Sequence, residues 1–192
     1  MIDYDTLFSE VGSVYHHAVR VVEEEDYDAV ARIPVHAAPD TALTLIQRLT
    51  RCALRHGIDV RYEKWDQPER LGCFDRTNRV ITINTAASLT KRAYALMHEL
   101  CHNFDPELPT FSLGEMIFGS PRIHQLEIAT DAANVLLLGE AGIDALAYGA
   151  YYIAAHQYQL SRYGTEPPTR ERILAIYDAV TRDLEHEERI AA

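Results

Sequence analysis

The clearest sign of chemistry in this sequence is the run His98-Glu99-Leu100-Cys101-His102, which has the pattern H-E-x-x-H within a predicted helix. Residues four positions apart lie on one face of a helix, so both imidazoles can reach one ion. Zinc accepts two such nitrogens at about 2.0–2.1 Å, needs a third protein ligand and keeps a fourth position for water. Glu99 projects beside the ion and can deprotonate that water, whose pKa bound zinc lowers to about 7. The pattern therefore predicts His98 and His102 as metal ligands and Glu99 as the general base.

A third ligand has to come from elsewhere, and the next predicted helix offers Glu127. The intervening loop is long enough for the chain to reverse and bring Glu127 onto the first helix. Asp131 lies one turn further on the same face, where it can accept the second N–H of a ligating imidazole. His124 is a substitute ligand, a transition-state donor or an exposed histidine at a helix start, and we favour the last. Cys101 is interpreted as a buried apolar residue rather than a thiolate near the metal.

Hydrophobic spacing predicts the elements that position these side chains. The predicted helices are 1–33, 41–56, 88–104, 121–138, 142–162 and 168–190, the predicted strands are 58–62, 71–74 and 79–84, and a loop is predicted over 105–119. Turn-forming residues at 75–78 predict that the last two strands pair as a hairpin. Asp40 or Thr41 is expected to cap the second helix, and Ser88 or Thr90 the third. This order is typical of an α+β fold.

Length and composition exclude several classes of protein. The chain has 192 residues, 47% of them apolar, which suits a single domain over 1–192. It carries 18 basic and 29 acidic residues, and the net charge of −11 argues against direct binding of nucleic acid. No apolar run approaches the roughly 20 residues of a membrane span, and the first ten residues lack the pattern of a secretion signal. Three cysteines imply no disulfide framework, so the expected compartment is the cytoplasm.

Three segments of the chain resemble the ImmA/IrrE family of metallopeptidases. They are 79–84, 92–102 and 127–138, within a resemblance that covers roughly 41–140. The resemblance implies that His98 and His102 are zinc ligands. It also implies that Glu99 is the catalytic base and Glu127 the third ligand. The implied fold is a minimal zincin: a small antiparallel sheet packed on the HExxH helix and a Glu-bearing helix, with extra N- and C-terminal helices. The core would then be 41–140, and 141–192 a C-terminal helical extension.

The chain departs from the family pattern at several positions: Cys101 for Gly, Thr130-Asp131 for Ala-Asn, Ala133 for Phe, and Gly139-Glu140 in place of Pro. None of these departures removes a proposed ligand or the base. They concern the subfamily, and therefore which protein is cleaved.

These features predict a cytoplasmic zinc endopeptidase in which Glu99 passes a proton from zinc-bound water to the leaving amine. The resemblance implies a regulatory protease that cuts a transcriptional repressor, so the expected partner is a separate helix-turn-helix protein. No direct nucleic-acid partner and no membrane partner are expected. Two alternatives remain: a catalytically silent, zinc-binding protein-interaction regulator with the same fold, and a structural metal site closed by Cys101 or His124. A later group of side chains is interpreted as core or interface rather than catalytic: Tyr148, Tyr151, Tyr152, His156 and Tyr158.

Overall fold

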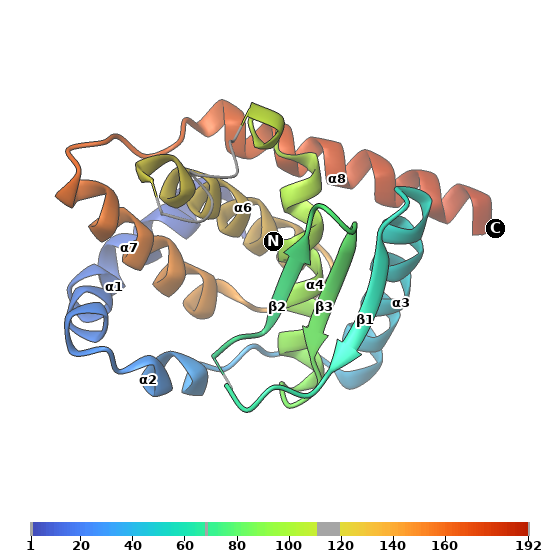
Figure 1. Ribbon diagram of the computed structural model, residues 1–192, viewed down its shortest axis with the longest axis horizontal. Helices are drawn as coiled ribbons and strands as arrows, with labels where there is room; N and C mark the ends of the chain where they lie inside the picture. Colours follow the sequence, from blue (N-terminus) through green and yellow to red (C-terminus); the bar gives the residue numbers. More distant parts are fainter. Residues whose placement is uncertain (1, 68, 111–119, 192) are drawn as a thin grey trace.

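The computed structural model describes residues 2–67, 69–110 and 120–191, and Figure 1 shows their arrangement. The elements are α1 (Tyr4–Glu24), α2 (Tyr27–Arg32), α3 (Pro39–Arg55), β1 (Asp59–Glu63), β2 (Gly72–Asp75), β3 (Val80–Asn84), α4 (Leu89–Phe104), η1 (Leu108–Thr110), α6 (Pro121–Glu140), α7 (Leu146–Arg162) and α8 (Arg170–Ala191). The predicted α+β order is confirmed. The predicted loop over 105–119 contains η1, and its residues 111–119 lie outside the described part of the chain.

The sheet has three strands in the order β1-β3-β2. The predicted hairpin is confirmed, because β2 and β3 are antiparallel with Gly72 opposite Ile83. Its turn is held by Asp75, whose carboxylate accepts the Asn78 backbone N–H at 2.9 Å. β1, however, pairs with β3 in parallel. The sheet is therefore mixed, where a purely antiparallel one was expected.

The parallel pairing requires the chain between β1 and β2 to cross the end of β3, as Figure 1 shows. Asn84, which is fully buried at that end, holds the crossing in place. Its side-chain oxygen accepts the backbone N–H groups of Trp65 at 3.1 Å and Ala86 at 2.9 Å. Its amide nitrogen donates to the carbonyls of Gln67 at 3.1 Å and Arg70 at 3.0 Å. One side chain thus fixes the approach of the chain to β2, beside α4.

The single helix expected over 1–33 is two helices. Glu25 ends α1 in the left-handed region, with φ of 55°. Asp26 then caps α2 by accepting the backbone N–H of Ala29. The run of acidic residues at this point therefore forms a helix junction rather than a continuous helical face.

The predicted helix starts are partly correct. Ser88 caps α4 as expected, by accepting the Lys91 backbone N–H at 3.3 Å. The expectation that Asp40 or Thr41 caps α3 is wrong, because α3 already begins at Pro39. Proline fits a first helical turn, where its missing N–H costs no hydrogen bond.

The core is organised around α6, whose residues 128–138 are all buried. A helix buried on every side needs neighbours all round, and α6 contacts α4, α7 and α8. α4 also packs against β2 and β3, while α1 covers α7. Figure 1 shows α4 behind the sheet. It also shows α8 running across α4 and α3. In the described residues no helix combines the length and the apolar character that crossing a membrane requires.

Candidate metal centre

The three predicted metal ligands lie together between α4 and α6. His98 Nε2 is 3.2 Å from Glu127 Oε2, and His102 Nε2 is 3.7 Å from the same oxygen. The two Nε2 atoms are 3.1 Å apart. Because His98 and His102 are one turn apart on α4, this convergence depends on α6 running back along α4 after the loop. The structure thus joins side chains that are separated in the sequence.

The geometry of this trio fits a divalent metal ion. Tetrahedral ligands about 2.0–2.1 Å from zinc are about 3.3–3.4 Å from one another, close to the distances between these three atoms. Each imidazole also engages its other nitrogen: His98 Nδ1 lies 2.8 Å from Asp131 and His102 Nδ1 lies 3.2 Å from Thr130. With Nδ1 donating, the Nε2 lone pairs are left for a shared ion. Two histidines and one glutamate are also the protein ligands of zinc sites that keep an open position.

Asp131 lies where the sequence placed it, one turn after Glu127 and buried. Its Oδ1 accepts hydrogen bonds from His98 Nδ1 at 2.8 Å and from the Tyr94 hydroxyl at 2.7 Å. Tyr94 was not identified from the sequence, although it precedes His98 by one helical turn and so shares its face. Thr130 was noted only as a departure from the family pattern. Such outer contacts orient ligands, and they became recognisable only once α4 and α6 were placed together.

Glu99 follows the first histidine and turns toward β2, where it is 9% exposed. A Cβ built on Gly72 would lie 3.1 Å from Glu99 Oε1, so glycine leaves room for the carboxylate. Strand β2 therefore lies directly against the proposed base.

Burial and neighbouring charges shift the pKa values of the four residues at this site. Burial lowers the pKa of His102 to about 4, so its imidazole is neutral at pH 7. Burial also lowers the pKa of His98, but the carboxylates of Asp131 and Glu127 outweigh it and raise that pKa well above its ordinary value. Burial raises the pKa of Glu127, yet the two imidazoles lower it overall. Burial raises the pKa of Glu99 to about 7.

A cleft of about 200 Å³ opens onto this centre. One wall is formed by Leu71 and Gly72, at the start of the edge strand β2. The opposite wall is one face of α7, with Tyr148, Tyr152 and His156 at successive turns. From the sequence, these three side chains were expected, together with Tyr151 and Tyr158, to be core or interface. Tyr148, Tyr152 and His156 line the cleft, whereas Tyr151 and Tyr158 do not.

The two residues considered as fourth ligands lie outside the trio. Cys101 is fully buried, and His124 bonds through Nδ1 to His156 Nδ1 at 2.9 Å. Within the described residues, the cluster of donor atoms contains neither of them. Among the described residues, a structural site closed by Cys101 or His124 is thus not the arrangement found.

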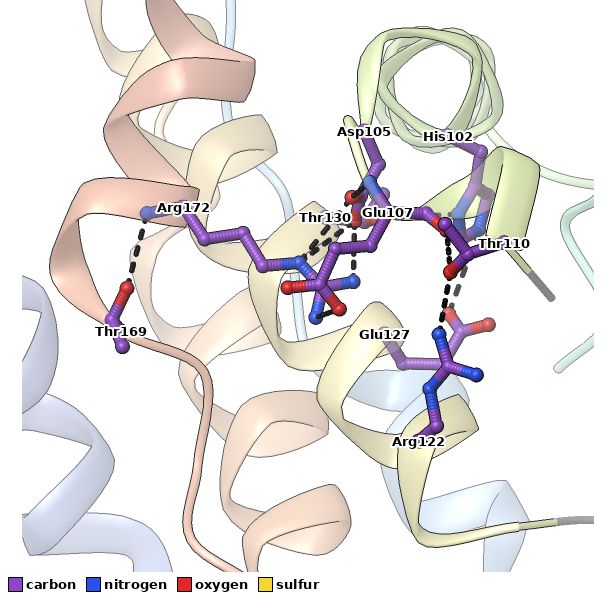
Figure 2. Close-up of polar contacts among 9 residues, drawn as sticks. All are labelled: His102, Asp105, Glu107, Thr110, Arg122, Glu127, Thr130, Thr169 and Arg172. Carbon is purple, nitrogen blue, oxygen red and sulfur yellow. Dashed lines mark hydrogen bonds and ion pairs between the residues drawn. The ribbon is translucent and has the colours of Figure 1, made fainter.

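An ion-pair network holds the C-terminal end of α4 (Figure 2). Arg172, near the start of α8, donates to Asp105, the residue that ends α4, with Nη2–Oδ2 at 2.7 Å. Its Nη1 also donates to Glu107 at 2.8 Å. The Asp105 side chain is fully buried and that of Arg172 is 7% exposed. α8 therefore holds α4 at a point one turn beyond His102, which sequence spacing could not reveal.

Comparison with protein families matches residues 53–164 to the peptidase M78 family, described as the IrrE N-terminal-like domain. Comparisons with curated proteins and with solved structures gave no match. The family match runs from the last turn of α3 to the end of α7 and contains both helices of the metal centre. Because it covers more than half of the sequence, the chain belongs to the peptidase M78 family, the ImmA/IrrE family of metallopeptidases.

Proposed function

We propose that this protein is a zinc-dependent endopeptidase with His98, His102 and Glu127 as metal ligands and Glu99 as the general base. The observation that carries the proposal is the convergence of the three donor atoms beside a cleft that Glu99 also lines. Three protein ligands leave one position toward the cleft, which is the arrangement of catalytic rather than structural zinc sites.

Zinc bound at this trio would act as a Lewis acid on the attacking water and on the scissile carbonyl. Glu99 accepts the proton of the water as its oxygen bonds to the carbonyl carbon. The same carboxylic acid then delivers that proton to the amide nitrogen as the C–N bond breaks. Gly72 leaves room beside β2 for the Glu99 carboxylate that makes both transfers. Tyr152 and His156, on the α7 wall, are the candidate donors to the developing oxyanion.

A peptide is the substrate class that suits this cleft. β2 is an edge strand, and an edge strand offers unpaired backbone N–H and C=O groups to an extended segment. Its first residue, Gly72, lies at the cleft beside Glu99. A peptide paired along β2 would therefore pass the base and the metal ligands with its backbone exposed to them.

The family and the net charge support a proposal for the wider role. We infer a regulatory cytoplasmic protease whose substrate is a DNA-binding protein such as a helix-turn-helix repressor. A net charge of −11 suits a basic partner. We further infer one domain, in which a 41–140 core carries the chemistry and 141–192 extends it, because α7 and α8 both pack on α6.

The experiment is a cleavage assay with matched chains. The zinc-loaded protein and its Glu99→Gln variant are incubated with DNA-binding proteins encoded beside its gene, and the products are identified by mass spectrometry. We expect cleavage by the first and a rate at least about 100-fold lower for the second, because general-base catalysis contributes about 10²–10⁴-fold. Stable binding of one of these proteins without cleavage by either chain would instead support the protein-interaction regulator.

A further inference from the structure

A second cluster of possible metal ligands, separate from the first, lies where the end of α3 meets α8. Cys52 and His56 are four residues apart at the end of α3, and Asp183 faces them from α8. Their sulfur, nitrogen and oxygen donor atoms all lie within 4.8 Å of one another. In the described residues, this cluster and the catalytic trio are the two groups of this kind.

The contacts within the cluster converge on one carboxylate. The Cys52 thiol, which is fully buried, donates to Asp183 Oδ2. The His56 Nε2 atom is buried and forms no hydrogen bond with a described residue, although Asp183 Oδ1 lies 3.1 Å away, within ion-pair distance of a protonated imidazole. Buried nitrogens in folded proteins are usually satisfied. An ion between the imidazole and the carboxylate would satisfy this nitrogen.

The surroundings hold the three donors in place. The His56 ring packs edge-on against Phe104 of α4, with centroids 5.0 Å apart. Arg55 Nη2 donates to Asp183 Oδ2 at 2.8 Å, which orients the carboxylate in the way that outer hydrogen bonds orient metal ligands. The His56 side chain is 33% exposed and that of Asp183 17%, so an ion has a path from solvent.

We propose that Cys52, His56 and Asp183 form a second binding site for a zinc-type divalent cation. A thiolate, an imidazole and a carboxylate are the donors that zinc accepts. Binding releases the thiol proton to solvent, and the thiolate and carboxylate charges then balance the ion. The site clips α8 to α3, independently of the chemistry at His98.

The test is a titration of the metal-free protein with Co²⁺, followed by absorption spectroscopy. A thiolate bound to Co²⁺ gives a near-ultraviolet charge-transfer band, whereas the catalytic trio contains only nitrogen and oxygen donors. We expect wild type to bind two equivalents and to show this band. Cys52→Ala should remove the band and one equivalent, while His56→Gln should weaken that equivalent at least tenfold. Cys73→Ala, which removes a cysteine on β2 outside the cluster, is the matched control and should leave the band and both Co²⁺ equivalents unchanged.

A His98→Gln/His102→Gln variant separates the two sites, since it should lose the sulfur-free equivalent and keep the band. His56→Gln also decides the question if Cys52→Ala fails to fold, because the imidazole is only half-buried. Two results would overturn the proposal: the absence of a charge-transfer band in wild type, or a band that persists when Cys52 is removed. The three residues would then form a hydrogen-bonded cluster that binds no metal ion.

Discussion

Replacing Asp131 with asparagine tests how the structure holds His98, the first proposed metal ligand. The carboxylate is 3% exposed and accepts from His98 Nδ1 at 2.8 Å and from the Tyr94 hydroxyl at 2.7 Å. Asparagine keeps the shape and one accepting oxygen but removes the negative charge. A hydrogen bond to a charged group contributes about 1.5–3 kcal/mol, against about 0.5–1.5 kcal/mol for a neutral one.

The expected loss is therefore about 1–2 kcal/mol, which corresponds to zinc binding about 5- to 30-fold weaker. Competition with a chelator of known affinity at fixed pH measures this directly, and circular dichroism confirms that the variant is folded. Tyr94→Phe is the matched control. It removes the other hydrogen bond to the same oxygen while leaving the charge, so we expect zinc affinity to change less than about threefold.

Two results would refute this reasoning. Asp131→Asn could bind zinc within about twofold of wild type, in which case the carboxylate does not act through His98. Tyr94→Phe could instead weaken binding as much as Asp131→Asn, and the effect would then come from general loosening of the contact between α4 and α6.

Three further predictions concern the framework. Arg172→Met should lower the free energy of unfolding in urea by about 3–5 kcal/mol, because it leaves the buried Asp105 carboxylate without its cationic partner. Adding Asp105→Asn should recover part of that loss. An equal loss in the single and the double variant would contradict this prediction. Gly149→Ala should lower the free energy of unfolding by about 1–2 kcal/mol, because the new Cβ would lie 2.1 Å from Val135 of α6. The cost of this overpacking exceeds the gain in helix propensity. Unchanged stability would show that α6 and α7 can move apart at this point without cost. Gly72→Ala should lower the rate of peptide cleavage about tenfold at unchanged zinc content, because a methyl group 3.1 Å from Glu99 Oε1 displaces the proposed base. An unchanged cleavage rate would show that Glu99 is not held against β2.

Local sequence rules located the chemistry because they act over one or two helical turns. The spacing of His98 and His102, the cap at Ser88 and the proline at the start of α6 each depend only on helix geometry. The hairpin was predictable for the same reason, since Asp75 and Asn78 form their turn within four residues. Where neighbouring residues determine an element, the sequence was sufficient.

The parallel pairing of β1 with β3 lay beyond these rules. Strand alternation does not record direction, and the crossing over β3 depends on the four hydrogen bonds of Asn84 to segments on either side of it. For a similar reason, the sequence could not show which aromatic residues of α7 line the cleft. Tyr152 and Tyr151 are adjacent in sequence, and only packing on α1 and α6 decides which of them faces the cleft.

The sequence by itself determined that two histidines and a glutamate share one helix, and it supplied Glu127 as a partner. The tertiary structure decided that α6 returns along α4, so that three donor atoms meet beside the cleft and Asp131 supports His98. It also brought Asp183 to Cys52 and Arg172 to Asp105. Helical periodicity is a property of a few neighbouring residues. Side chains that are tens to more than a hundred positions apart meet only when the hydrophobic core around α6 closes.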